Sequence, residues 1–273
     1  MKLFGYVVLS AVGLTSIAVA SETLTLDAVN SAGLSEKLEK GTSPVLIKAQ
    51  VLLDRARFSP GVIDGRNGEN LQNAIKAFEK VKGLKVDGKL DDEFWTKLNE
   101  GTSDPALVEY EISEGDVKGP FASIPDKMED QAKLERLSYS SAEELLAEKF
   151  HMDVDLLKEL NPGKRFDAAG TSIVVANVMH DPKNDEQAKK DLAKIEVVKS
   201  EKVLRALAKD GKIIAVYPAS IGSDEKPAPM GSQDVRSVAP NPTYTYNPDY
   251  AFKGVKAKEK FVIKPGPNNP VGS

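Results

Sequence analysis

The sequence predicts a mixed α+β protein of several small domains, and three observations support this class. Residues 43–100 place apolar side chains at helical spacing between capping signals. Residues 137–178 have the order strand, helix, helix, strand. Residues 195–273 are β-patterned around an Asp-Gly turn. A chain of 273 residues has room for two or three domains of roughly 100–200 residues each.

The composition excludes several classes of function. The chain has 37 basic and 41 acidic residues and a formal net charge of -4, which argues against a nucleic-acid partner. It contains no cysteine, so it offers no disulfide, no thiol nucleophile and no cysteine zinc site. Its two histidines, His151 and His180, are expected to be solvated side chains. We therefore predict no catalytic residue, no metal ligand and no cofactor in this chain.

Residues 1–20 have the features of a secretory signal. Lys2 precedes an apolar run over Leu3–Val19, and Ala18-Val19-Ala20 has the small-x-small pattern of a cleavage site. The alternative is a membrane anchor, but the run is short and rich in small residues. We predict an exported protein, periplasmic or cell-wall associated, with no membrane span after signal cleavage. Residues 21–42 then form an N-terminal lead.

Residues 43–100 predict a helical domain. Ser43 followed by Pro44 is typical of a helix start, and Asp91 is placed to cap a later helix. The pairs Asp64-Gly65 and Asp87-Gly88 predict turns, because Asp accepts backbone N–H bonds and Gly adopts positive φ. The predicted buried faces consist of Leu46, Ala49, Leu53 and Ala56, then Leu71, Ala74, Ile75 and Phe78, then Phe94, Trp95 and Leu98.

These residues resemble a peptidoglycan-binding domain of three helices. The resemblance rests on three runs, Ala74–Glu79, Gly83–Asp91 and Phe94–Leu98. It covers about Val45–Leu98 and implies peptidoglycan as the partner. The family usually has Gln where this chain has Glu79. We expect Phe78 and Trp95 to pack inside the domain, and the alternative is that Trp95 stacks on a sugar.

Residues 101–136 predict a linker and an entering strand, and residues 137–178 a second module. Leu137–Tyr139 is the predicted first strand of that module, and Ser172–Ala176 is its last. The helices between them are signalled by Ser140 and Ser141 with Glu143 and Glu144 at capping-box spacing, by Asp153, and by Asn161-Pro162-Gly163.

The order of this second module resembles a lysin-motif (LysM) domain, a βααβ fold that recognises chains of N-acetylglucosamine. The matching features are Leu156 and Leu160, the pair Asn161-Pro162, and Gly170 before the last strand. The usual Gly-Asp-Thr of the first turn is replaced by Tyr139-Ser140-Ser141 in this interpretation. The resemblance implies glycan chains as a partner.

Residues 179–194 predict a charged linker or a solvated helical turn, and residues 195–273 predict strands. Val203–Ala208 and Lys212–Tyr217 flank Asp210-Gly211, which predicts a hairpin closed by a type I′ turn. Four later blocks follow in order, namely Ile221-Gly222, Pro229-Met230-Gly231, Asn241-Pro242-Thr243-Tyr244 and Pro265–Gly272.

These blocks resemble the N-terminal part of an L,D-transpeptidase catalytic domain, which implies an incomplete β-sandwich over residues 195–273. That family cross-links peptidoglycan stem peptides by acyl transfer through a Cys thiolate, with a His as general base. The motif that holds both residues normally follows the last block, but this sequence stops at Ser273 and contains no cysteine. No catalytic residue is carried over, and the chain as given is expected to be inactive.

Three functions stay open from the sequence. The first is an exported cell-wall protein that resembles an L,D-transpeptidase and is truncated before the nucleophile, with stem peptides and glycan chains as partners. The second is a non-catalytic peptidoglycan-binding protein. The third is a lytic wall enzyme, for which the sequence offers no metal triad. We also predict that residues 195–273 are not independently stable, because their apolar faces and strand edges would be exposed.

Overall fold

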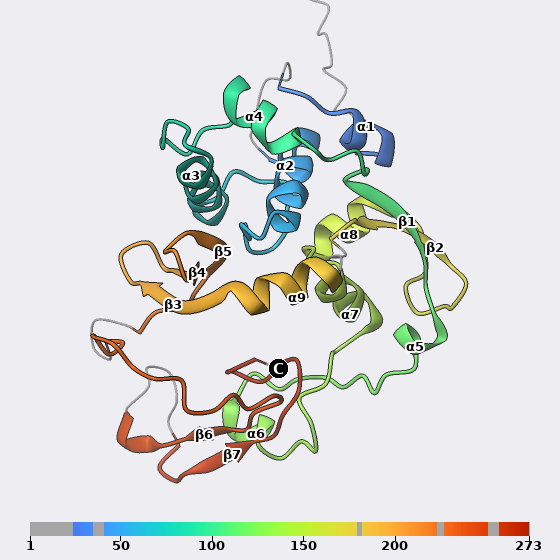
Figure 1. Ribbon diagram of the computed structural model, residues 1–273. Helices are drawn as coiled ribbons and strands as arrows, with labels where there is room; N and C mark the ends of the chain where they lie inside the picture. The colour runs from blue at the N-terminus through green and yellow to red at the C-terminus, as the bar shows by residue number, and fades with distance from the viewer. Residues whose placement is uncertain (1–23, 35–40, 179–181, 223–226, 251–256, 273) are drawn as a thin grey trace, which may run out of the picture.

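A computed structural model describes residues 24–34, 41–178, 182–222, 227–250 and 257–272 (Figure 1). The predicted signal at 1–20 and His180 lie outside the described residues. The mixed α+β class is confirmed: the chain begins with a group of helices, further helices follow as far as Asp191, and the strands form small antiparallel sheets. In the described ranges no helix has the length and apolar character needed to cross a membrane.

The helical domain contains α2 (Pro44–Arg55), α3 (Glu69–Lys82) and α4 (Asp92–Asn99), preceded by the short α1 (Leu26–Ser31). The predicted helix boundaries are confirmed. Ser43 is the N-cap of α2, and Gly83 ends α3 in the left-handed conformation with φ 72°. The Asp91 side chain accepts the Phe94 backbone N–H at 2.9 Å and caps α4.

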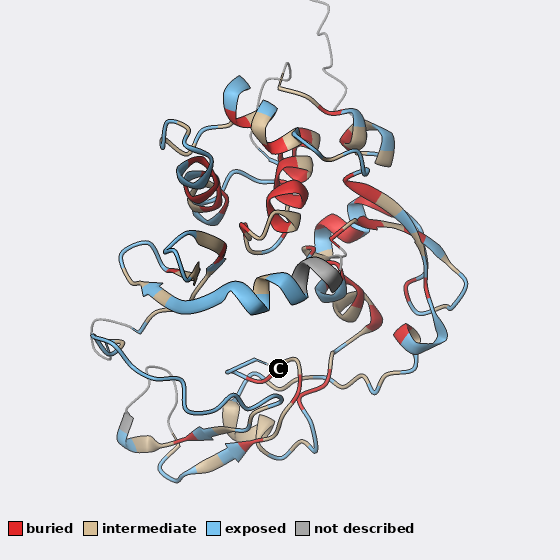
Figure 2. Ribbon diagram, in the orientation of Figure 1, coloured by how far each residue is buried: buried red, intermediate tan, exposed pale blue. Residues whose placement is uncertain are grey.

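Helix α2 is buried along most of its length, as its colour in Figure 2 shows. Its predicted face packs with α3, α4 and Phe58, and this face includes Leu46, Ala49 and Leu53. A second face, with Ile47 and Val51, joins the core of the neighbouring βααβ unit. Figure 1 accordingly places α2 between α3 and that unit. The helical domain and the βααβ unit therefore share a continuous set of buried contacts.

The βααβ unit differs from the sequence prediction at its first strand. It consists of β1 (Leu107–Glu111), the short helices α5 (Glu114–Val117) and α6 (Met128–Gln131), then α7 (Ala142–Lys149), α8 (Val154–Leu160) and β2 (Ser172–Ala176). Strand β1 pairs antiparallel with β2 from Leu107↔Ala176 to Glu111↔Ser172. The strand predicted at Leu137–Tyr139 was wrong, and the opening strand lies in the segment expected to hold a linker and an entering strand.

The physical reason is where the backbone of residues 137–139 finds its partners. The Leu137 N–H donates to the Pro265 carbonyl at 3.1 Å, and the Leu137 carbonyl accepts from the Asn268 N–H at 3.1 Å. In segment 108–112, by contrast, the exposed Glu109 and Glu111 alternate with partly or fully buried side chains that end at Ile112, and Leu107 before them is buried. Strand β1 pairs with β2 because it buries apolar side chains in the same core as α7 and α8. Residues 137–139 cannot take this place, since their backbone is bonded to the C-terminal region.

Residues 182–218 form a helix followed by a three-stranded sheet. Helix α9 (Pro182–Asp191) occupies the predicted charged linker and leads into β3 (Leu192–Val198), β4 (Val203–Ala208) and β5 (Ile213–Pro218), in the order β3-β4-β5. The predicted β4–β5 hairpin is confirmed, but its turn type was wrong. At the pair Asp210-Gly211 only the glycine has positive φ, 82°, and the register shifts at Ala206 and Leu207, as in loops with one left-handed residue.

The β3–β5 sheet packs by one face on the helical domain. Val203 and Val216 are buried against it, and Val216 exchanges backbone hydrogen bonds with Arg57 and Ser59 at 2.8 and 2.9 Å. Val197 and Tyr217 lie in one cross-strand row on the opposite face and are about half exposed. The outer edge of β5, which was expected to be exposed, is thus covered in part by the helical domain.

The C-terminal strands are short and separate from the larger sheet in the described residues. Strand β6 (Tyr244–Tyr246) pairs with β7 (Phe261–Ile263), and a 3-10 turn, η1 (Pro248–Tyr250), follows β6. Tyr246 and Phe261 stack with ring centroids 4.7 Å apart. The described strands thus form small separate sheets, and in Figure 1 β6 and β7 lie beside α6, away from the helical domain.

Candidate functional site

A groove of about 690 Å³ opens between the helical domain and the βααβ unit. Three parts of the chain line it: the end of α2 with the loop after it, α7 and the start of α8, and one residue of β5. The lining residues are Asp54, Ser59, Gly61, Val62, Glu144, Ala147, Glu148, His151, Met152, Asp153, Val154 and Tyr217. The groove is therefore a feature of the assembled domains, and neither domain forms it alone.

Backbone hydrogen bonds fix the two walls of the groove to each other. The Ile63 N–H donates to the His151 carbonyl at 2.8 Å, and the Asp153 N–H donates to the Ile63 carbonyl at 2.9 Å. These bonds make an isolated parallel bridge between Ile63 and Met152, both buried. His151 has φ 55°, an uncommon left-handed conformation for a residue other than glycine. The groove walls are thus held by main-chain geometry as well as by side chains.

Arg55, the last residue of α2, ties the same two units together at a second place. Its guanidinium donates to the carbonyls of Asn177, at 2.5 Å, of Asp104, at 3.1 Å, and of Pro105. These carbonyls lie just before β1 and just after β2. Since the planar guanidinium presents several donors in fixed directions, one side chain holds both strand ends against α2.

His151 forms an ion pair across the groove with Asp54. Its Nδ1 lies 3.1 Å from Asp54 Oδ2, and its side chain is 45% exposed whereas that of Asp54 is 6% exposed. The hydrogen bond to Asp54 raises the pKa of His151, while burial opposes the shift. His151 is exposed, as expected for a solvated side chain, but its ion pair with Asp54 was not predicted. No local signal could have shown this, because the partner lies 97 residues earlier.

Carboxylates dominate the polar lining of the groove. Glu144 accepts from Asn268 Nδ2 at 2.8 Å and from Ser140, and these hydrogen bonds lower its pKa against the opposing effect of burial. Glu148, which is exposed, accepts from the Tyr139 hydroxyl at 3.1 Å. Burial and the nearby charge of Glu148 raise the pKa of Tyr139 to about 12. Asp153 caps α8 through its Oδ1.

The rest of the lining is largely apolar. Val62 is 56% exposed and Tyr217 is 45% exposed, and Ala147, Met152 and Val154 form the wall below them. The residues that line the groove include four carboxylates and one histidine and no lysine or arginine. The arrangement suits a ligand with a positive group and a small apolar part. In the described ranges no three His, Cys, Asp or Glu side chains gather as a metal site would require.

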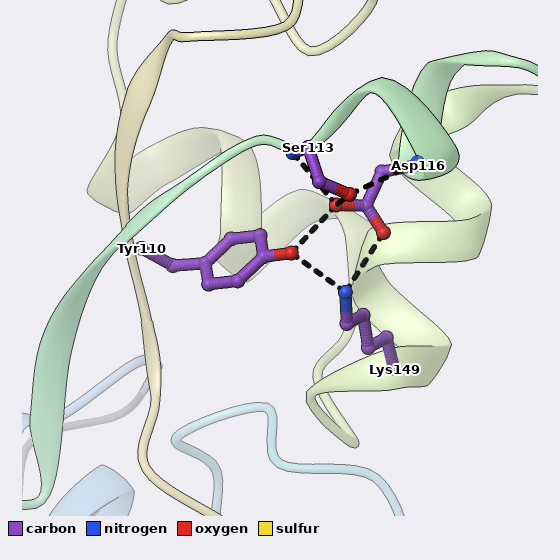
Figure 3. A network of polar contacts seen from close by, with 4 residues as sticks. All are labelled: Tyr110, Ser113, Asp116 and Lys149. Atoms are coloured by element: carbon purple, nitrogen blue, oxygen red, sulfur yellow. Dashed lines mark hydrogen bonds and ion pairs between the residues drawn. The ribbon is translucent and has the colours of Figure 1, made fainter.

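A polar network behind the groove fixes α7, the helix that presents Glu144 and Glu148 (Figure 3). Asp116 Oδ2 accepts from the Tyr110 hydroxyl at 2.6 Å, and from the Ser113 N–H at 2.9 Å and hydroxyl at 2.7 Å. Its Oδ1 accepts from Lys149 Nζ at 2.8 Å. The network thus connects β1, the N-terminus of α5 and the last residue of α7.

This network has the electrostatics of a structural contact. Burial opposes ionisation of Asp116, but hydrogen bonds from Lys149, Tyr110 and Ser113 outweigh it and hold the pKa of this carboxyl well below its usual range. The pKa of Lys149 is raised, since its bonds to Asp116 and Tyr110 exceed the effect of burial. Sequence reasoning missed this cluster. The available signal was the pair Gly115-Asp116 directly after an alternating apolar-polar segment.

Two buried polar side chains hold the Asp-Gly turns of the helical domain in the same way. Gln50 Oε1 accepts from the N–H groups of Asp64, at 3.2 Å, and Gly65, at 2.7 Å. Glu79, only 1% exposed, accepts through Oε2 from the N–H groups of Asp87 and Gly88, both at 3.0 Å. The Glu in place of the usual Gln therefore keeps the acceptor that this turn needs.

Trp95 and Phe78 are both part of the helical core, as predicted. Phe78 is 2% exposed, and its ring lies edge-on to Phe58 and Phe94, with centroids 5.5 and 5.4 Å apart. Trp95 is partly buried against the same core, and Lys48 Nζ lies 5.6 Å from its ring centroid.

A second hollow of about 680 Å³ lies beside α4. It is lined by Leu84, Asp92, Glu93, Thr96, Lys97, Asn99 and Glu100.

Comparison with known families confirms one of the three resemblances. The family model PG_binding_1, described as "Putative peptidoglycan binding domain", matches residues 42–98. No curated protein matches the chain. The matched range begins just before α2 and ends within α4, so it coincides with the folded helical core. Residues 42–98 thus match a family of peptidoglycan-binding domains, and a domain of this kind points to the cell wall.

Proposed function

We propose that this chain is a non-catalytic peptidoglycan-binding protein of the cell wall. The observation that carries the proposal is the family match over residues 42–98, the same residues whose three helices pack around one buried core. The absence of cysteine leaves the chain without the nucleophile of a cysteine-dependent acyl transfer. Export fits this location and is supported by the signal-like composition of residues 1–20, with its Ala18-Val19-Ala20 end.

The βααβ unit is the second binding module of this proposal. Its LysM resemblance is supported by the pairing of β1 with β2 and by the turn after β1, which carries Gly115-Asp116 followed by Val117. Asn161 of the Asn-Pro pair clamps the end of α8 to β2: its amide donates to the carbonyls of Leu157 and Val174, and its Oδ1 accepts the Val174 N–H at 2.6 Å. We propose glycan chains as its ligand.

The L,D-transpeptidase resemblance of residues 195–272 supports a second candidate, contact with stem peptides. A specific observation favours it: the block Pro265–Gly272 is folded tightly. Asn269 is buried, and its amide donates to the Lys264 carbonyl at 2.9 Å while its Oδ1 accepts the Val271 N–H at 3.0 Å. We propose that this segment contacts stem peptides without an acyl-transfer step.

Sedimentation with purified peptidoglycan sacculi tests the proposed function. The chain is expected to pellet with intact sacculi, and digestion of the sacculi with a muramidase should return it to the supernatant. Cellulose is the control, because it is an insoluble glycan without acetamido groups or peptides. A chain that stays in the supernatant with sacculi, or pellets equally with cellulose, contradicts the proposal.

A further inference from the structure

We propose that the groove between the helical domain and the βααβ unit binds the amine-bearing peptide part of peptidoglycan. This inference rests on the proposed function and adds to it a site and a ligand class. Peptidoglycan offers two kinds of surface, uncharged acetylated sugars and short peptides with free amino groups. The charges and the shape of the groove discriminate between the two.

Charge complementarity is the first step. The groove is lined by four carboxylates, and its only group that can carry a positive charge is His151. The carboxylates are Asp54, Glu144, Glu148 and Asp153. They come from α2, from α7 and from the N-cap of α8, so negative charge faces the groove from both of its walls. A neutral sugar gains little from such a field, whereas an ammonium group gains a charge-assisted hydrogen bond.

The structure also distinguishes among these carboxylates. Asp54 is paired with His151, Asp153 is used as a helix cap, and Glu144 accepts from Asn268 and Ser140. Glu144 and Glu148 lie four residues apart on α7, so they point to the same side of the helix. Two like charges at this spacing repel each other slightly in an empty site. An ammonium group beside Glu148, the exposed member of the pair, relieves that repulsion and gains a charge-assisted hydrogen bond, which makes Glu148 the place for the amine.

The apolar wall suits the rest of a short peptide. Val62 and Tyr217 are about half exposed at the rim of the groove, and Ala147 and Met152 are buried beneath it. Methyl and methylene groups next to the amine can cover this surface and remove it from water. Sugar binding usually relies on exposed aromatic faces, and Tyr217 is the only aromatic residue among those that line the groove.

The test compares sacculi before and after their amino groups are acetylated with acetic anhydride. Acetylation removes the positive charge and leaves the glycan chains intact. We expect acetylation to weaken binding of the wild-type chain about tenfold, the effect of losing one hydrogen bond to a charged group. Glu148→Gln should weaken binding to native sacculi by about the same factor and should abolish the difference between native and acetylated sacculi.

A matched variant and a folding measurement complete the design. Glu186→Gln makes the same change of charge at an exposed position of α9, outside the groove and outside residues 42–98, and should bind like wild type. The glutamine that replaces Glu148 still has an oxygen that can accept from Tyr139, so the melting temperature of Glu148→Gln should match that of wild type.

The outcomes separate this inference from the proposed function. Equal binding of wild type to native and acetylated sacculi overturns the inference and leaves peptidoglycan binding intact. An equal loss of binding in Glu186→Gln and Glu148→Gln also overturns it, because the effect would then be one of net charge. Failure of wild type to bind native sacculi at all overturns the proposed function and the inference together.

Discussion

Single buried polar residues determine the local conformation of this chain at several turns. Asp116 is 5% exposed and makes four hydrogen bonds, which join a strand, a helix N-terminus and a lysine (Figure 3). Glu79 is 1% exposed and serves two backbone N–H groups of one turn. In each case the carboxylate replaces water for donors that the fold has buried, so its removal leaves those donors without an acceptor.

Replacement of Asp116 by Asn should lower the free energy of unfolding by about 1–3 kcal/mol at pH 7. The folded pKa of Asp116 is depressed, so its contribution is present above the unfolded pKa of about 3.9 and is lost as pH falls through the folded value. Urea unfolding of the wild type and of Asp116→Asn at pH 7 and at pH 3 measures this. A difference that is as large at pH 3 as at pH 7, or larger, would contradict the ionic basis of the contact.

The two substitutions Glu79→Ala and Glu79→Gln should differ sharply. Alanine leaves the N–H groups of Asp87 and Gly88 unpaired and should destabilise the domain by about 1–3 kcal/mol. Glutamine retains an acceptor oxygen and should stay close to wild type. Thermal unfolding of the full chain followed by circular dichroism distinguishes them. The idea fails if both variants lose the same stability.

At the scale of elements, strand choice and turn type were set by packing. Strand β2 pairs with β1, although Leu137–Tyr139 lies nearer in sequence, because β1 can bury Leu107 against the helices while the other segment is covered by residues 265–268. The short C-terminal strands are held in the same manner. Asn268 links their extension to the βααβ unit through Ser138 and Glu144, at 2.9 and 2.8 Å.

Gly266 is the position where this packing is closest. It has φ 148°, and a Cβ atom there would lie 2.1 Å from the Leu137 carbonyl oxygen. Gly266→Ala should therefore detach residues 263–269 from Leu137 and Ser138 while the helical domain stays folded. Hydrogen exchange at the Leu137 and Asn268 amides should accelerate at least about tenfold, as expected for local opening.

Gly33→Ala is the control for this experiment, because a Cβ atom at that position would have open space around it to 4 Å among the described residues. It should leave the exchange of both amides unchanged. Unchanged protection at Leu137 in Gly266→Ala would show that the backbone yields without separation of the two segments.

At the scale of the whole molecule, the groove depends on how the helical domain and the βααβ unit meet. Helix α2 belongs to both cores, Arg55 binds the ends of β1 and β2, and Ile63 bonds to the loop before α8. The β3–β5 sheet also packs against the helical domain through Val203 and Val216. Strand β5 of this sheet contacts α3 and forms a bridge to Phe58. These contacts support the prediction that residues 195–273 are unstable in isolation, which stays a prediction.

The His151–Asp54 pair should make this junction sensitive to pH. The folded pKa of His151 is raised, so the pair's contribution is complete below the unfolded pKa of about 6.5 and disappears as pH rises through the folded value. The acidic groups that line the groove around the ring are Asp54 of α2, Glu144 and Glu148 of α7, and Asp153 at the start of α8.

His151→Gln should therefore lower the melting temperature at pH 5.5 and have little effect at pH 9. The loss should stay below about 1 kcal/mol, because the ring is half exposed and solvent screens the pair. Melting curves of wild type and His151→Gln at the two pH values test this. A larger loss at pH 9 than at pH 5.5 would mean that the neutral ring, not the ion pair, stabilises the junction.

Sequence by itself determined the features that depend on near neighbours. The helix caps at Ser43, Asp91 and Asp153, the left-handed end at Gly83 and the β4–β5 hairpin follow from residues a few positions apart, and the family of residues 42–98 follows from the same local pattern. Capping hydrogen bonds and apolar periodicity involve residues only a few positions apart, so the features that they produce can be predicted from the sequence.

The tertiary structure alone decided which distant residues meet. It chose β1 as the partner of β2, paired His151 with Asp54, and brought Tyr217 to the same groove as Glu148. These contacts join segments separated by tens of residues, and many pairings are compatible with the same local patterns. Only the joint burial of apolar faces and the need to satisfy buried polar groups select one of them, and the groove exists as a result of that selection.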